Sequence, residues 1–149
     1  MRTIVTFRST MFNTSEVKPY FINACCFGDD VAKWLIAELR AKSVDTEAEP
    51  GQEDFGWYLN FQIGRVRSTF VIGYRPGDDD TDEGTWIGWL ERNRGLVASL
   101  LGGRGHDIDS AAAKMLNSVL SGSKEIRDVR WHDRRDFDKG NEDLGTRVP

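Results

Sequence analysis

The chain has 149 residues, of which 39% are hydrophobic, and a formal net charge of −4. A chain of this size fits one domain, which buries roughly 70% of the surface that its unfolded form exposes and needs no disulfides to fold. The acidic balance argues against a general nucleic-acid-binding protein, because such affinity rests largely on Lys and Arg side chains that neutralise phosphates.

Cysteine usage and hydropathy indicate a cytoplasmic protein. Cys25 and Cys26 are adjacent. Neighbouring Cα atoms lie about 3.8 Å apart, closer than an unstrained disulfide prefers, so both residues are expected to be thiols. The longest apolar runs are far shorter than the roughly 20 residues of a membrane span, and the N-terminus has no extended hydrophobic signal region. We therefore expect no membrane association.

The first predicted elements are a strand and a helix, separated by an irregular stretch over residues 9–28. Residues 3–8 alternate and are rich in β-branched side chains, which favours a strand. Gly28 and Asp29 offer an N-cap for a helix over residues 30–42. The apolar face of this helix carries Val31, Trp34, Leu35 and Leu39.

Two long alternating runs predict the centre of a sheet. A short strand over residues 44–48 precedes them and ends at Pro50. Gly64, as the first of two loop residues, favours a type II′ hairpin between the two runs. The residues that share one face are Trp57, Leu59, Phe61 and Ile63 before the turn, and Val66, Ser68, Phe70, Ile72 and Tyr74 after it.

A polar loop over residues 76–84 carries five acidic side chains. Their mutual repulsion predicts a solvated loop. An EF-hand that began at Asp78 would need a glycine and a bidentate glutamate where the chain has Glu83 and Trp89, so no calcium site of that kind is expected. A looser divalent-ion site is the alternative.

The last third of the chain predicts a strand over residues 85–91, a long helix and a final strand over residues 126–131. Aromatic side chains on both faces of the first of these strands indicate an inner position in the sheet. The helix has Asp107 as its N-cap and Gly122 after its C-terminus. Its apolar stripe carries Ile108, Ala111, Ala112, Met115, Leu116, Val119 and Leu120.

This order of elements predicts an α+β fold over residues 1–132. We expect a two-layer sandwich, in which two main helices cover one face of a mainly antiparallel sheet. Residues 133–149 are charged, nearly free of large apolar side chains and interrupted by glycines, which predicts a disordered polar tail.

Four short patterns resemble a family of small bacterial proteins of unknown function. The resemblance covers residues 19–131 and implies a bacterial, single-domain protein. It implies no activity and no functional residues, because the family has no assigned activity. The patterns are Cys26-Phe27-Gly28-Asp29-Asp30, Ala32-Lys33-Trp34-Leu35, Glu53-Asp54-Phe55-Gly56-Trp57 and Arg127-Asp128-Val129-Arg130-Trp131.

Glu53, Asp54 and Trp57 are the first candidate binding residues, at the mouth of a strand. A carboxylate beside aromatic rings can be desolvated, which raises its pKa and suits it to acid/base work. However, adjacent strand residues point to opposite faces, so the two carboxylates do not easily converge. We prefer a structural role, in which one carboxylate satisfies turn amides and Gly56 permits a bulge.

Other candidate reactive groups have no partners in the sequence. His106 and His132 belong to no metal-ligand spacing and are predicted to be surface residues, so we expect no metal and no cofactor. Cys25 and Cys26 lie near a helix N-terminus, which favours a thiolate, but no His or Asn partner is evident. They are expected to be buried packing residues.

The second candidate binding surface surrounds an apolar segment over residues 96–101. Its predicted structure is either a short helix or a loop folded over the sheet. An apolar centre with an arginine rim is typical of a protein-binding surface. The alternative is that its leucines cap the edge of the sheet. The candidate residues are Arg92, Arg94, Leu96, Leu100 and Arg104.

No constellation combines a nucleophile, a base and an orienting group, so we expect a non-enzymatic domain that binds another protein in a regulatory, accessory or toxin-neutralising role. The alternative is a small-ligand-binding protein or an enzyme that uses residues 53–57. A third reading is nucleic-acid binding through Arg65, Arg67 and Arg75, which are separated by even numbers of residues and so fall on one side of the hairpin.

Overall fold

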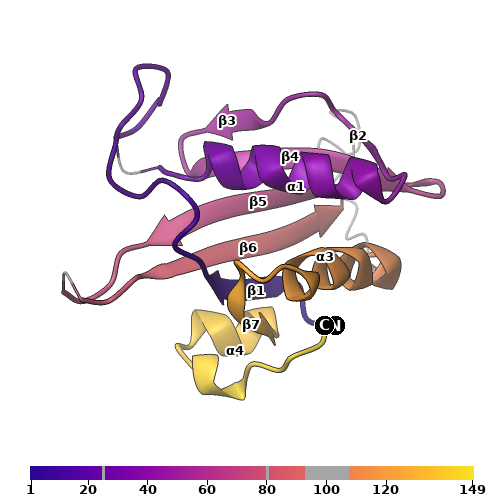
Figure 1. Cartoon of the computed structure of the whole chain (residues 1–149). Helices are drawn as coiled ribbons and strands as arrows, with labels where there is room; N and C mark the ends of the chain where they lie inside the picture. The colour runs from indigo at the N-terminus through magenta and orange to yellow at the C-terminus, as the bar shows by residue number, and fades with distance from the viewer. Residues whose placement is uncertain (25, 80, 93–107) are drawn as a thin grey trace.

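The computed structural model describes residues 1–24, 26–79, 81–92 and 108–149 (Figure 1). Its centre is an antiparallel sheet with the strand order β2-β4-β5-β6-β1-β7, and β3 pairs with β4 beside β2. The strands are β1 (Ile4–Arg8), β2 (Asp45–Thr46), β3 (Gly51–Glu53), β4 (Gly56–Ile63), β5 (Val66–Arg75), β6 (Thr85–Arg92) and β7 (Arg127–His132).

Two long helices, α1 (Asp29–Ala41) and α3 (Ser110–Gly122), lie on one face of this sheet (Figure 1). The shorter α4 (Arg134–Asp138) and η1 (Glu142–Leu144) follow β7. The predicted α+β sandwich, with two main helices on one face of a mainly antiparallel sheet, is therefore confirmed. Among the described residues no helix is long and apolar enough to cross a membrane.

The core lies between the helices and the sheet because both elements have one apolar face. Alternation along β4 buries Trp57, Leu59 and Phe61, while the helical period of α1 buries Leu35 and Leu39. The largest fully buried side chains also include Trp86, Trp131, Phe7, Phe70, Ile72, Leu116 and Leu120.

The β4–β5 hairpin has the turn that its sequence predicts. Ile63 pairs with Val66 across a loop of two residues. Gly64 has a φ of 58° and Arg65 has no positive φ, which excludes a type I′ turn and fits the predicted type II′ turn.

The ends of α3 differ from the sequence prediction. Its N-cap is Asp109, whose side chain accepts a hydrogen bond from the backbone N–H of Ala111. The predicted cap, Asp107, lies outside the described residues. Gly122 is the last helical residue, and the extended Ser123 follows it as the C-cap.

In residues 133–149, where the sequence predicts a disordered tail, the structure contains α4, η1 and a bridge from Thr146 to Trp131. Asp133 caps α4 through the backbone N–H of Arg135, and the backbone of Thr146 exchanges two hydrogen bonds with that of Trp131 at 2.6 and 2.9 Å. The physical reason is that β7 is an edge strand, whose unpaired backbone groups offer a returning segment hydrogen bonds that need no apolar side chains.

Candidate functional site

The face of the sheet opposite α1 and α3 carries an apolar row across three strands. Tyr58 on β4 pairs with Val71 on β5, and Val71 pairs with Trp89 on β6. Their neighbours along each strand point into the core, so alternation directs these three side chains to the opposite face. Val71 is buried between the two rings, which are themselves partly buried.

Phe55 extends this row at one end. It is 56% exposed, and its ring centroid lies 6.0 Å from that of Trp89. Gly73 lies beside the same indole: a Cβ there would lie 3.9 Å from Trp89, which is an ordinary van der Waals contact. We call Phe55, Tyr58, Val71 and Trp89 the aromatic band.

The rim of the aromatic band is acidic. Trp89 Nε1 donates a hydrogen bond of 3.1 Å to Glu91 Oε1. Glu53 and Asp54 are exposed in the turn that holds Phe55. None of these three carboxylates forms an ion pair within the described part of the chain, so their charges remain available to a partner.

The structure separates the residues of the first sequence-predicted site. Trp57 points into the core, is 5% exposed and donates a hydrogen bond of 2.8 Å from Nε1 to the backbone oxygen of Cys26. Glu53 and Asp54 are exposed at the turn, where the backbone oxygen of Asp54 accepts a hydrogen bond from Asn23. The indole is therefore in the core, whereas the two carboxylates face solvent.

The second sequence-predicted surface is largely outside the described residues. Arg92 is exposed at the end of β6. The positions of Arg94, Leu96, Leu100 and Arg104 fall in the part of the chain that the structure does not describe, as do Cys25 and His106, so these predictions stand as they were made.

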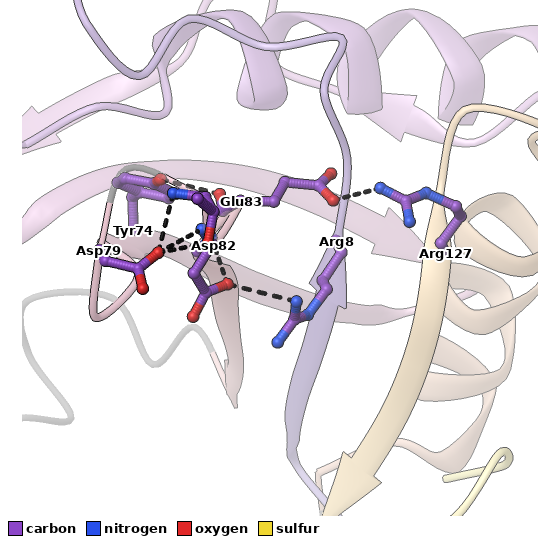
Figure 2. A network of polar contacts seen from close by, with 8 residues as sticks. Arg8, Tyr74, Asp79, Asp82, Glu83 and Arg127 are labelled. Atoms are coloured by element: carbon purple, nitrogen blue, oxygen red, sulfur yellow. Dashed lines mark hydrogen bonds and ion pairs between the residues drawn. The ribbon is translucent and has the colours of Figure 1, made fainter.

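The acidic loop after β5 is tied to two strands rather than solvated throughout. Asp82 pairs with Arg8 on β1 at 3.3 Å, and Glu83 pairs with Arg127 on β7. Figure 2 shows both pairs. Asp79 accepts hydrogen bonds from the backbone and the hydroxyl of Thr81, and these bonds lower the pKa of its carboxyl. The described residues contain no cluster of three or more His, Cys, Asp or Glu suited to a metal ion.

The aromatic band was accessible to sequence reasoning only in part. Strand alternation places Trp89 opposite the core side chains of β6, and the same alternation places Tyr58 opposite Trp57. Aromatic side chains on both faces of β6 predict an inner position in the sheet, and β6 does lie between β5 and β1, but this pattern does not say which face the helices cover. The missing information is that both long helices pack on one side, which local periodicity does not encode.

No family model, curated protein or solved structure matches this chain.

Proposed function

We propose that this chain is a non-enzymatic domain that binds another protein through the aromatic band. The observation that carries this proposal is the cross-strand row Tyr58, Val71 and Trp89 on the sheet face that the two long helices leave uncovered. Rigid aromatic anchors on a regular element lose little conformational entropy on binding and are typical of interface hot spots.

The rim indicates the chemistry of the partner. Glu53, Asp54 and Glu91 surround the band without forming ion pairs among the described residues, and the whole chain carries a net charge of −4. A complementary surface would have an apolar centre and a rim of Lys or Arg side chains. Such a partner suits a regulatory, accessory or toxin-neutralising protein.

The alternative, a small-ligand site or an active site around residues 53–57, has less support. It needs a carboxylate that meets a base, a thiol or a guanidinium in a pocket. Glu53 and Asp54 are exposed instead, and Trp57 is in the core.

A site-specific photocrosslinker tests the proposal. A photoreactive phenylalanine analogue at position 55 should capture a discrete protein from native lysate, whereas the same group at position 148, which is 60% exposed, should not. Mass spectrometry identifies the captured protein and the crosslinked peptide. Identical products from both positions would show non-specific contact and contradict the proposal.

The dissociation constant for the captured protein then measures the contribution of the band. Phe55→Ala should weaken binding by about tenfold or more, and Val148→Ala by less than about twofold. Glu91→Gln should slow association and reduce its salt dependence, because rim charges act mainly on the association rate. If Phe55→Ala and Tyr58→Ala both bind the captured protein with wild-type affinity, the aromatic band is not part of the interface.

A further inference from the structure

A separate polar cleft of about 330 Å³ lies where the sheet meets the C-terminal segment. Four strands and η1 contribute to its lining. Its polar lining includes Thr6, Arg8, Arg75, Thr85, Arg130 and Glu142. The volume lies at the lower end of the range of small-molecule sites.

Strand pairing gathers the basic side chains of this cleft. Arg75 pairs with Thr85 across β5 and β6, and Thr6 pairs with Arg130 across β1 and β7. The lining also contains Arg8, which is paired with Asp82 just outside the cleft, so the three guanidinium groups of the lining face Asp82, Asp128 and Glu142. Three guanidinium groups gathered in one cleft, with Arg130 in no ion pair among the described residues, favour an anionic ligand.

Arg75 already holds an oxyanion in this cleft. Its two terminal nitrogens donate hydrogen bonds of 2.6 and 2.9 Å to the two carboxylate oxygens of Glu142. This fork geometry is the one in which Arg binds carboxylates and phosphates. The hydrogen bonds from Arg75 also hold the pKa of Glu142 below its usual value.

Two further features set this cleft apart from a simple surface ion pair. Arg130 is exposed in it and has no ionic partner among the residues that the structure describes. Asp128, in the same lining, has a φ of 54°, and the pairing of β1 with β7 shifts register beside it. Non-glycine residues in this conformation and irregular strand pairing are both enriched beside functional sites.

We propose that this cleft binds a small oxyanion, a phosphate ester or a carboxylate, between Arg75 and Arg130, and that Glu142 occupies part of the site until the ligand displaces it. In this arrangement the side chain of Glu142 competes with the ligand from within the same chain. Removing its charge therefore removes the competitor and leaves both arginines in place.

Calorimetric titration with inorganic phosphate, pyrophosphate and succinate, at matched ionic strength, tests this proposal. Glu142→Gln should bind the preferred anion about tenfold more tightly than the wild type, because the glutamine cannot form the charged pair with Arg75. Arg130→Gln should weaken binding by about tenfold, and it leaves the Arg75–Glu142 pair intact. The matched control is Arg65→Gln in the β4–β5 turn, which should change the affinity by less than about twofold.

The choice of probes distinguishes the two sources of the oxyanion. Preference for phosphate or pyrophosphate indicates a phosphorylated ligand, and preference for succinate indicates a carboxylated one. If Glu142→Gln binds none of the three at millimolar concentration, or if Arg130→Gln and Arg65→Gln have equal effects, the Arg75–Glu142 contact is structural only and the proposal is overturned. Thermal melts of each variant confirm that it is folded.

Discussion

The hydroxyl of Thr6 and Nε2 of His132 lie 2.8 Å apart in a buried hydrogen bond that joins β1 to the end of β7. His132 is 1% exposed, so the prediction that it is a surface residue is wrong. The C-terminal segment covers it: the ring of Phe137 lies 5.3 Å away, centroid to centroid, and a side chain at Gly145 would overlap the imidazole.

Burial of His132 predicts that the protein loses stability in mild acid. Desolvation lowers the pKa of this imidazole from 6.5, and nearby Arg130, Arg2 and Arg75 lower it further, against the attraction of Glu142. Below about pH 6.5 the unfolded chain binds a proton that the folded chain excludes, so the free energy of unfolding falls as pH falls, by at most about 1.4 kcal/mol per pH unit.

Urea unfolding of the wild type and His132→Asn between pH 7.5 and pH 5 measures this effect. The variant should be less stable at neutral pH, because the asparagine does not fill the imidazole site, and its stability should vary less with pH over this window. Parallel pH profiles for the two proteins would assign the acid sensitivity to other groups.

Removal of residues 134–149 should destabilise the domain. The deletion takes away the two backbone hydrogen bonds to Trp131 and the Arg75–Glu142 pair, and it exposes His132. A loss of about 2–3 kcal/mol is expected, which lowers Tm by about 5–10 °C in a chain of this length. Deletion of residues 147–149 alone is the matched control and should have little effect. An unchanged Tm in the longer deletion would show that the segment is not docked in solution.

The sequence predicts the sheet and helices because their residues carry local periodic signals. Trp57, Leu59 and Phe61 repeat every two residues, and Leu116 and Leu120 repeat every four. Tertiary relationships have no such signal. The contact between Glu142 and Arg75 spans 67 residues, and that between Thr6 and His132 spans 126, so neither the cleft nor the docked tail follows from local pattern.

Gly56 is required by the turn that presents Phe55. Its φ is 146°, and a Cβ there would clash with the backbone oxygen of Ile72 on the adjacent strand. Gly56→Ala should therefore destabilise the fold by more than about 2 kcal/mol. Gly64→Ala is the control, because Gly64 also has a positive φ but has open space around it, and it should cost only about 1–2 kcal/mol. Equal costs in denaturant unfolding would contradict the close approach to Ile72.

The hydroxyl of Tyr20 donates a hydrogen bond of 2.5 Å to Asp29, and this bond is the main reason that the pKa of Tyr20 is raised to about 12. Asp29→Asn should bring the pKa of Tyr20 back toward 10, which an ultraviolet titration of tyrosinate can follow, with Tyr20→Phe identifying the signal. Because the raised pKa belongs to the folded state, the wild type should lose stability as pH rises from about 10 to 12. If Asp29→Asn does not change the titration of Tyr20, the hydrogen bond to Asp29 is not the cause of the raised pKa.

Substitutions at Trp57 and Trp89 distinguish the core from the proposed interface. Trp57 is 5% exposed and hydrogen-bonded to Cys26, so Trp57→Ala should cost about 3–5 kcal/mol of folding free energy. Trp89 is half-exposed on the open face, so Trp89→Ala should cost less, about 1–2 kcal/mol, because less of the indole loses protein contacts. The control Glu53→Gln should change stability by less than about 0.5 kcal/mol, since this carboxylate is exposed.

For binding, unlike for stability, Trp89→Ala should have a larger effect than Trp57→Ala. At a temperature where every variant is folded, Trp89→Ala should weaken affinity for the captured protein by about tenfold or more, because the indole is central to the aromatic band. Trp57→Ala should affect binding only as far as it unfolds the domain, since its side chain faces away from the band. If Trp57→Ala abolishes binding in a folded protein while Trp89→Ala does not, the interface does not lie on the aromatic band and the proposal is contradicted.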